Sequence, residues 1–285
     1  MSSKRRVGGR RPSRHTSRAG RDLGAAIGVG VGLSVLVLAS LLIDRRAFLV
    51  VLCAAVGVGV WEMSRAVAAG GIRVAIVPVL VGVLSMNVAA YVRGGEALTV
   101  TFGLTVLATI VWRTADGVAH AIGDISGSVL VTIYPGFLAG FAAMMLAAED
   151  GATRIIFFIF VTVASDIGGY AVGVLAGRHP MAPTVSPKKS WEGFAGSVLA
   201  SAVVAAGLGL WFFEIHPALG AVVGAVVAAI ATLGDLTESL IKRDLGVKDM
   251  GTLLPGHGGV MDRLDSLVLT APVIWAFLFL TLGGR

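Results

Sequence analysis

Nine apolar segments constrain the fold of this chain more than any other feature of its sequence. A helix needs about 20 mostly apolar residues to cross the hydrocarbon core of a bilayer. Charged residues make up only 14% of the chain, against roughly 25% in soluble domains. We therefore expect an all-α polytopic membrane protein with about nine transmembrane helices. The predicted spans are residues 23–43, 47–61, 74–92, 97–112, 128–148, 154–177, 194–213, 217–234 and 266–282.

Residues 1–22 form a basic N-terminal segment. They hold eight Lys and Arg residues against one acid, Asp22, so this segment has a net charge of +7, and the rest of the chain has −1 of the formal total of +6. A segment rich in Arg, Ser and Gly without apolar periodicity is expected to be a disordered tail. Two roles stay open for it: a topology signal that holds the N-terminus in the cytoplasm, and attraction to anionic lipid headgroups. Because the net positive charge belongs to this tail and the rest of the chain is close to neutral, we expect no nucleic-acid partner.

The distribution of basic residues predicts the orientation of the spans. With the N-terminus in the cytoplasm, the cytoplasmic connections hold ten Lys and Arg residues and the opposite side holds five. Cytoplasmic loops of membrane proteins carry such an excess. We expect a protein of the bacterial-type inner (plasma) membrane whose N-terminus and polar motifs face the cytoplasm. The predicted cytoplasmic connections are residues 62–73, 113–127, 178–193 and 235–265.

The most polar stretch is Ser239–Asp265, which contains four Asp, two Lys, two Arg and one His. Charges between two apolar spans are costly unless water, a counter-ion or a phosphorylated substrate accompanies them. Asp235, Ser239 and Lys242 are spaced i, i+4 and i+7, which places them on one helix face. The stretch is therefore a candidate metal and phosphate site at a membrane surface.

Within this stretch, a glycine-rich loop around His257 precedes a helix start that carries Asp262 and Asp265. Such a loop suits a phosphate, and hard carboxylate oxygens suit Mg²⁺ better than zinc. The alternative is an ordinary capped loop with solvated charges, in which His257 is a hydrogen-bonded turn residue. Asp262 and Asp265, at i and i+3, are expected to point the same way.

Two upstream motifs are further candidates. Asp166 is expected on the helix face of Gly169, Gly173 and Gly177 that packs against other helices, either as a site residue or as a neutral structural Asp. The motif Ser186-Pro-Lys-Lys-Ser190-Trp-Glu-Gly193 is either a phosphate cradle or a juxtamembrane basic patch. A third group, Asp116, His120 and Asp124, is expected to be solvated surface.

These motifs resemble a known family. Ser239-x-x-Lys242-Arg243, Lys248-Asp249, His257-Gly258-Gly259 and Asp262-Arg263-x-Asp265 resemble the C-terminal signature of the phosphatidate cytidylyltransferases, also called CDP-diacylglycerol synthases. The Ser186–Gly193 motif and Ser165-Asp166 are similar to upstream motifs of that family. The resemblance covers about residues 165–266; residues before it match only in hydropathy.

The resemblance implies transfer of the cytidylyl group of CTP to phosphatidate, which gives CDP-diacylglycerol and pyrophosphate. It also implies a homodimer and a metal centre that uses Asp235 and Asp262 with Mg²⁺ and K⁺. The implied arrangement is a tail (1–22), N-terminal transmembrane helices (23–150) and a C-terminal catalytic region (151–285).

We assign the candidate site residues three roles. The catalytic candidates are Asp235, Asp262, Lys188, Lys189 and Asp166. The substrate-binding candidates are Ser186, Ser190, Ser239, Lys242, Arg243, Lys248, His257, Gly258, Gly259 and Arg263. The metal-ligand candidates are Asp235, Asp262, Asp265 and Asp166.

Two alternative functions stay open. A CTP-dependent polyprenol or phytol kinase also handles CTP at a membrane, but it phosphorylates an alcohol. A cation or organophosphate transporter built around Asp166 requires polar groups through the whole bilayer depth, whereas the outer half of the predicted spans has few.

Overall fold

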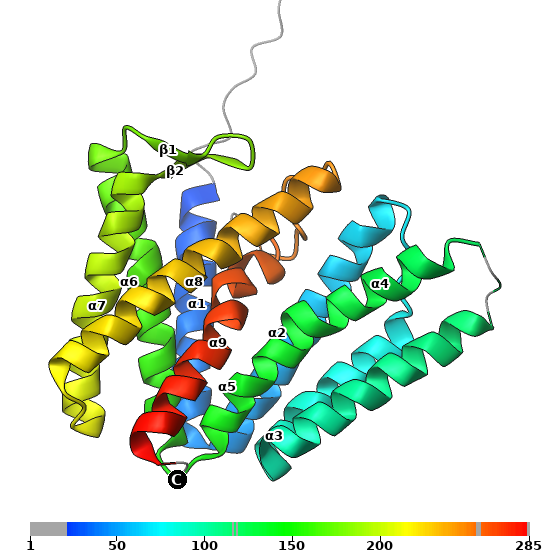
Figure 1. Cartoon of the computed structure of the whole chain (residues 1–285), viewed down its shortest axis with the longest axis horizontal. Helices are drawn as coiled ribbons and strands as arrows, with labels where there is room; N and C mark the ends of the chain where they lie inside the picture. The colour runs from blue at the N-terminus through cyan, green and yellow to red at the C-terminus, as the bar shows by residue number, and fades with distance from the viewer. Residues whose placement is uncertain (1–21, 116, 118, 255–257, 284–285) are drawn as a thin grey trace, which may run out of the picture.

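The protein is a bundle of long helices with one short β-hairpin (Figure 1). The computed structural model describes residues 22–115, 117, 119–254 and 258–283; the predicted tail before residue 22 lies outside them, as does Asp116. The elements are α1 (Asp22–Ile43), α2 (Arg45–Ala69), α3 (Ile76–Thr114), α4 (Ala121–Val131), the π-helix η2 (Thr132–Phe137), α5 (Leu138–Ala147), α6 (Gly151–Ala176), β1 (Pro180–Ala182), β2 (Ser186–Ser190), α7 (Trp191–Phe213), α8 (Pro217–Asp244) and α9 (Met261–Leu282).

Seven helices in the described part of the chain are long and apolar enough to cross a membrane. They are α2, α3, the continuous run from α4 to α5 (Ala121–Ala147), α6, α7, α8 and α9. Large apolar side chains face outward from them, as in Trp211 and Leu280, which are 79% and 80% exposed. Such outward apolar surface suits lipid rather than water. The prediction of a helical polytopic membrane protein is confirmed at this level.

Helix α3 reverses its direction at Gly94, whose φ of 73° and ψ of −156° are not helical. A methyl group at Gly82 would collide with Thr105, and these two residues lie at nearly equal distances along the chain from Gly94. The two arms of α3 therefore pack side by side as a helical hairpin. They correspond to the predicted spans 74–92 and 97–112.

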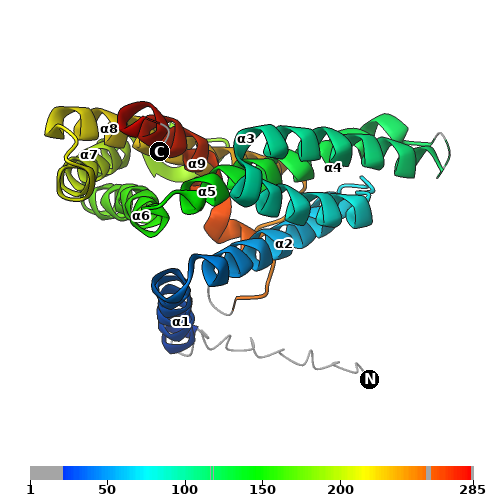
Figure 2. The same ribbon diagram turned by 90° about the horizontal axis from the view of Figure 1, so that it is seen from below.

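Helix α1 is set apart from the other helices and lies next to the start of α2 (Figure 2). Its described apolar part, Gly28–Ile43, is shorter than the seven spans. The Asp44 carboxylate accepts a hydrogen bond of 2.8 Å from the Arg46 backbone N–H and so caps α2. This cap explains the sharp turn between the two helices, because an acid at this position satisfies an otherwise unpaired N–H group.

The connections rich in polar residues gather at one end of the bundle. Figure 1 shows the β-hairpin, the end of α8 and the start of α9 at the same end as the start of α1. The C-terminus, the link between α5 and α6 and the link between α7 and α8 lie at the other end. The chain thus separates a polar end from a plain one, as the pattern of spans predicts.

The β-hairpin was not predicted, and it is the main departure from an all-α fold. Pro180 pairs with Ser190 and Ala182 with Ser186 in two antiparallel strands. Glu192 anchors the base of the hairpin, because its Oε2 accepts hydrogen bonds from the backbone N–H groups of Arg178 (3.0 Å) and His179 (3.2 Å). The hairpin therefore holds the lysine-bearing motif against the start of α7.

Small residues bring α6 and α7 into close contact. A methyl group at Gly168 would collide with Gly196, and one at Gly169 would collide with Ser197. Close approach of backbones through small residues is a common way to pack membrane helices. The predicted packing face of α6, with Gly169, Gly173 and Gly177, is confirmed, and Asp166 lies one turn before it.

The core joins helices from both halves of the chain. Val60 and Met63 of α2 pack in one cluster with Met261 and Val268 of α9. The predicted division at residue 150 is not tested by this packing and stays a prediction. The N-terminal helices nevertheless support the start of α9, which carries three of the candidate site residues, Asp262, Arg263 and Asp265.

The expectation that Asp124 is solvated surface is wrong. Its side chain is 1% exposed, and its Oδ2 pairs with Arg113 Nε at 2.8 Å. Its Oδ1 accepts a hydrogen bond of 2.7 Å from the Arg73 backbone N–H. The sequence pattern missed this because the arginine lies eleven residues earlier, at the end of α3. Asp124 therefore ties the start of α4 to α3 and to the link before α3; His120 is exposed, as expected.

Candidate active site

A cavity of about 650 Å³ opens at the polar end of the bundle, between α6, α7, α8, α9 and the β-hairpin. Segments far apart in the sequence contribute to its wall. The lining residues are Val163, Ser165, Asp166, Gly169, Tyr170, Gly173, Met181, Lys188, Lys189, Ser190, Gly193, Phe194, Ser197, Thr232, Asp235, Glu238, Ser239, Lys242, Asp249, Asp262, Arg263, Asp265 and Ser266.

At one end of the cavity, Asp235 of α8 is held by two side chains. Lys189 of β2 forms an ion pair with its Oδ2, and Ser266 of α9 donates a hydrogen bond of 2.5 Å to its Oδ1. Lys189 Nζ also lies 3.5 Å from the Thr232 carbonyl oxygen. Asp235 therefore joins the hairpin, α8 and α9.

At the other end, Asp262 lies in the first turn of α9 and accepts several hydrogen bonds. Lys242 Nζ of α8 lies 2.9 Å from its Oδ1. The backbone N–H groups of Gly259 (2.8 Å) and Met250 (3.1 Å) donate to its Oδ2. Lys242 also pairs with Glu238 Oε2 at 2.6 Å. The Asp262 carboxylate thus holds both the loop before α9 and the Lys242 side chain.

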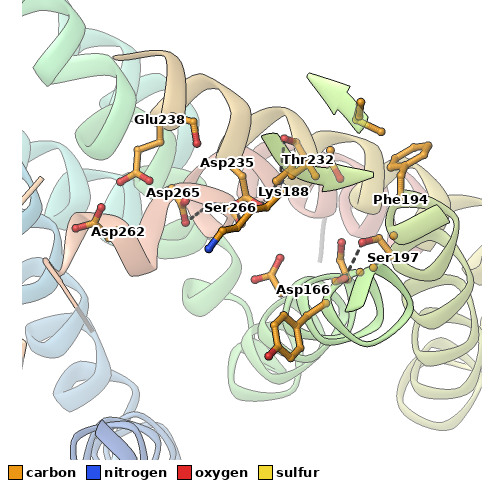
Figure 3. A pocket seen from close by; sticks show the side chains of 18 of the residues that line it. Asp166, Lys188, Phe194, Ser197, Thr232, Asp235, Glu238, Asp262, Asp265 and Ser266 are labelled. Carbon is orange, nitrogen blue, oxygen red and sulfur yellow. Dashed lines mark hydrogen bonds and ion pairs between the residues drawn. The ribbon is translucent and has the colours of Figure 1, made fainter. Parts of the chain in front are cut away.

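Two further acids lie between these ends. Asp265 is close enough to Glu238 and to Asp235 for their charges to interact. Glu238 Oε1 is buried and has no hydrogen-bond partner in the described part of the chain. We call Asp262, Glu238, Asp265 and Asp235 the acidic row. Figure 3 shows this row on α8 and α9, with Asp166 of α6 on the opposite wall.

The structure brings many of the predicted site residues together around this cavity. Three of the motifs contribute: Ser165-Asp166, the lysine motif and the stretch that ends at Asp265. The predicted spacing of Asp235, Ser239 and Lys242 on one face of α8 is confirmed. The predicted site residues that line the cavity are Asp166, Lys188, Lys189, Ser190, Asp235, Ser239, Lys242, Asp262, Arg263 and Asp265.

Other predicted site residues lie outside the cavity wall. Arg243 donates from Nε to the Val185 carbonyl oxygen at 3.4 Å and so contacts the hairpin. The Gly259 N–H is bonded to Asp262 rather than open to an anion. Ser190 lines the cavity, but its hydroxyl caps α7 by accepting a bond of 3.1 Å from the Gly193 N–H. Ser186, Lys248 and Gly258 also lie outside the wall, and His257 falls outside the described residues.

Several residues of the site were missed by sequence reasoning. Glu238 and Ser266 carry a signal that could have found them: each lies on the helix face of a predicted site residue, at i+3 from Asp235 and i+4 from Asp262. Glu62, which contacts the start of α9, carries no such signal. Its partner lies 199 residues later in the chain.

The donor set has the chemistry that a hard cation requires, but it is not assembled as a ready site. Carboxylate oxygens line the cavity, and Mg²⁺ prefers such ligands. In the described part of the chain, no group of three or more His, Cys, Asp or Glu side chains is arranged to hold an ion. Asp235 and Asp262 each pair with a lysine instead. The predicted metal ligands therefore stay a prediction.

Fold and site together define a helical membrane protein with a charged cavity at one end, lined by carboxylates and lysines that suit a phosphorylated substrate. The model of the cytidylyltransferase family matches residues 25–281, and the chain belongs to that family.

Curated relatives extend this likeness over the length of the chain. A protein of Mycobacterium bovis named phosphatidate cytidylyltransferase is 37% identical over 282 residues, which cover 94% of this chain and 92% of the relative. Relatives of the same name from Mycobacterium leprae (37% over 287 residues, 95% of this chain and 92% of the relative) and from Synechocystis (32% over 292 residues, 92% and 97%) are similar.

Proposed function

We propose that this protein is a phosphatidate cytidylyltransferase, which transfers the cytidylyl group of CTP to phosphatidate and gives CDP-diacylglycerol and pyrophosphate for phospholipid synthesis. One observation carries the proposal: three separated motifs, around residues 165, 188 and 235–266, line a single cavity. The family and its curated relatives agree with this activity. The cavity opens at the end of the bundle where a soluble nucleotide and a lipid headgroup can meet.

The reaction requires two anionic substrates to approach each other. A phosphate oxygen of phosphatidate attacks the α-phosphorus of CTP; the new P–O bond forms as the bond to the bridging oxygen of pyrophosphate breaks. An ionised phosphate is already nucleophilic, so no covalent enzyme intermediate is required. Catalysis then consists of positioning and of neutralising charge in the transition state.

The cations of the cavity serve that neutralisation. Lys188 and Lys189 on the hairpin and Lys242 and Arg263 on the helices line the cavity. In the substrate-free arrangement, Lys189 and Lys242 rest on carboxylates. On binding of CTP, the ammonium group of Lys189 turns to the phosphate oxygens and leaves the Asp235 carboxylate available, whereas Lys242 stays on Glu238 and Asp262 and offers its positive charge from there.

The carboxylates would hold the divalent cation that this chemistry uses. Bound Mg²⁺ supplies positive charge to the phosphates and orients them for displacement. Asp235, Asp262, Asp265 and Asp166 are the proposed ligands, and their oxygen chemistry suits Mg²⁺ and K⁺. Lys242 lies at the Asp262 end of the acidic row, where it pairs with Asp262 and Glu238, and Lys189 pairs with Asp235 at the other end. We therefore assign the two ends to separate contacts rather than to one shared ion.

The membrane placement follows from the polar end of the bundle. We assign nine crossings, with α1 and the two arms of α3 counted separately, and place the N-terminus and the cavity on the cytoplasmic side of a bacterial plasma membrane. The lipid enters sideways: Tyr170, which is 75% exposed, and Phe194 line the cavity beside the bilayer. The protein works as a homodimer.

Purified protein in liposomes tests the function. We expect phosphatidate, CTP and Mg²⁺ to yield CDP-diacylglycerol with release of pyrophosphate. Label at the α-phosphorus of CTP should reach the lipid, and label at the γ-phosphorus should not. Transfer of the γ-label to an alcohol would identify a kinase instead. Solute flux in liposomes without nucleotide would identify a transporter.

A further inference from the structure

Glu62 is a buried acid on α2, in the part of the chain that carries none of the motifs. Its side chain is 1% exposed, and its Oε2 accepts a hydrogen bond of 2.9 Å from the Met261 backbone N–H. Met261 is the first residue of α9 and directly precedes Asp262. A negative group at a helix N-terminus is favourable, because the first N–H groups of a helix lack partners within it.

The Glu62 carboxylate is enclosed by two glycines of the loop before α9. A methyl group at Gly251 would collide with its Oε1, and one at Gly259 would collide with its Oε2. Met250, which precedes Gly251, and Gly259 itself donate their backbone N–H groups to Asp262. Glu62 and Asp262 therefore both contact the same two loop segments, 250–251 and 259–261.

Packing alone does not account for an acid at this position. Oε1 of Glu62 is buried and has no hydrogen-bond partner in the described part of the chain. Burial of an unpaired carboxylate oxygen is costly, and an apolar side chain fills a core without that cost. Neighbours on the same helix, Val60 and Met63, are fully buried apolar residues.

We propose that Glu62 is a positioning residue of the active site. It fixes the loop before α9 and the first turn of α9, so that Asp262 faces the cavity and meets Lys242. The inference rests on the proposed function, because it acts through Asp262. It also gives the N-terminal half of the chain an indirect part in the reaction, through Asp262, although that half carries no catalytic motif.

The first experiment compares Glu62→Ala with Glu62→Gln in liposomes that contain phosphatidate. A misplacement of about 1 Å in a catalytic group can lower the rate by about 10²-fold. We expect Glu62→Ala to lower kcat by roughly 10- to 100-fold with KM for CTP changed less than about threefold. Glu62→Gln should retain at least about a third of kcat, because the amide oxygen can still accept the bond from the Met261 N–H.

A matched control is Ser64→Ala on the same helix. Ser64 is buried, and its hydroxyl donates to the Val60 carbonyl oxygen within α2 at 2.7 Å. Its loss should leave kcat unchanged. A folded Glu62→Ala protein whose kcat stays within threefold of the parent would overturn the proposal, as would failure of Glu62→Gln to restore the rate.

A second variant tests the same contact from the other side. Gly251→Ala should displace the Glu62 carboxylate and lower kcat by about tenfold. In the Glu62→Ala background the added methyl has space, so Gly251→Ala should then have no further effect. If Glu62→Ala does not fold, Gly251→Ala alone carries the test, and normal kcat for it would overturn the proposal.

Asp262→Asn separates this inference from the function on which it rests. If Asp262→Asn is inactive and Glu62→Ala is normal, only the role of Glu62 fails. If Asp262→Asn turns over normally, the proposed role of Asp262 fails and the positioning role of Glu62 fails with it. If the parent protein forms no CDP-diacylglycerol, the proposed function itself fails.

Discussion

The two lysine–aspartate pairs of the cavity differ in burial and in the elements that carry them. The side chains of Lys189 and Asp235 are 25% and 30% exposed, and the lysine lies on a two-stranded hairpin. Those of Lys242 and Asp262 are 17% and 6% exposed, and both residues lie on long helices. We propose that the first pair opens on CTP binding, whereas the second stays part of the packed structure.

This difference indicates that the two ends of the acidic row have different roles. Partly exposed ion pairs contribute little to stability, while removal of one partner from a buried pair leaves an uncompensated charge. The Asp262 end is a fixed support, and backbone N–H groups as well as Lys242 hold it. The Asp235 end is the adjustable side, where a lysine can exchange a carboxylate for a phosphate. The predictions below test that contrast.

The largest effect is expected for Asp262→Asn. The amide keeps the shape of the side chain but removes the negative charge that organises Lys242, the loop and the proposed cation. Loss of one preorganised electrostatic contact costs about 10²–10³ in kcat, and we expect at least the upper value. CDP-diacylglycerol formation by the purified variant measures it. Near-normal turnover would contradict both the metal assignment and the contrast between the two ends.

The contrast itself is tested by Lys242→Met and Lys189→Met. Both should lower kcat by about 100-fold. Only Lys242→Met should also destabilise the fold, by about 3 kcal/mol, because it leaves Glu238 and Asp262 buried without a cation. Lys189→Met should change stability by at most about 1 kcal/mol. Unfolding of both variants in the same detergent measures the difference, and equal losses of stability would show that the two ends are built alike.

A smaller effect is expected for Ser266→Ala. Its hydroxyl donates a bond of 2.5 Å to Asp235, and a hydrogen bond to a charged group contributes about 1.5–3 kcal/mol. We expect kcat to fall about tenfold, with the protein still folded. Thr270→Ala one turn later is the control, since that hydroxyl donates to the Ser266 carbonyl oxygen within α9 and contacts the Thr162 hydroxyl of α6 at 3.0 Å, with neither threonine in the cavity wall. Equal rates for the two variants would remove Ser266 from the site.

The smallest effect is expected for Arg243→Ala. Its guanidinium contacts the hairpin through a long bond of 3.4 Å to the Val185 carbonyl oxygen and lies outside the cavity wall. Loss of this bond should weaken only the attachment of the hairpin at the Asp235 end. KM for CTP should then rise about threefold, with little change in kcat. Steady-state kinetics over a range of CTP concentrations measures this. A 100-fold loss of kcat would instead make Arg243 a direct substrate contact.

Sequence patterns predicted the helices and much of the site for a simple physical reason. Crossing a bilayer requires long apolar runs, and charge placed between such runs requires a function, so Asp166, Lys189 and Asp235 were visible at once. Spacing along one helix then placed Ser239 and Lys242 correctly beside Asp235.

Contacts between residues on different helices could not be predicted from the sequence in the same way. The hairpin has strands of only three and five residues, and its lysine motif shows no apolar alternation. The burial of Asp124 depends on Arg113 of another helix, and the contact of Glu62 depends on Met261 of α9. Such pairs become apparent only when the helices are packed together.

The cavity opening beside Tyr170 has a consequence for how the enzyme meets its lipid. If phosphatidate enters sideways as proposed, its diacyl tails stay in the bilayer, and the headgroup arrives by two-dimensional diffusion rather than through bulk water. Turnover should then follow the mole fraction of phosphatidate in the bilayer. Dilution with inert lipid at a constant total amount of phosphatidate should slow the enzyme, as expected of a catalyst that works at an interface between two phases.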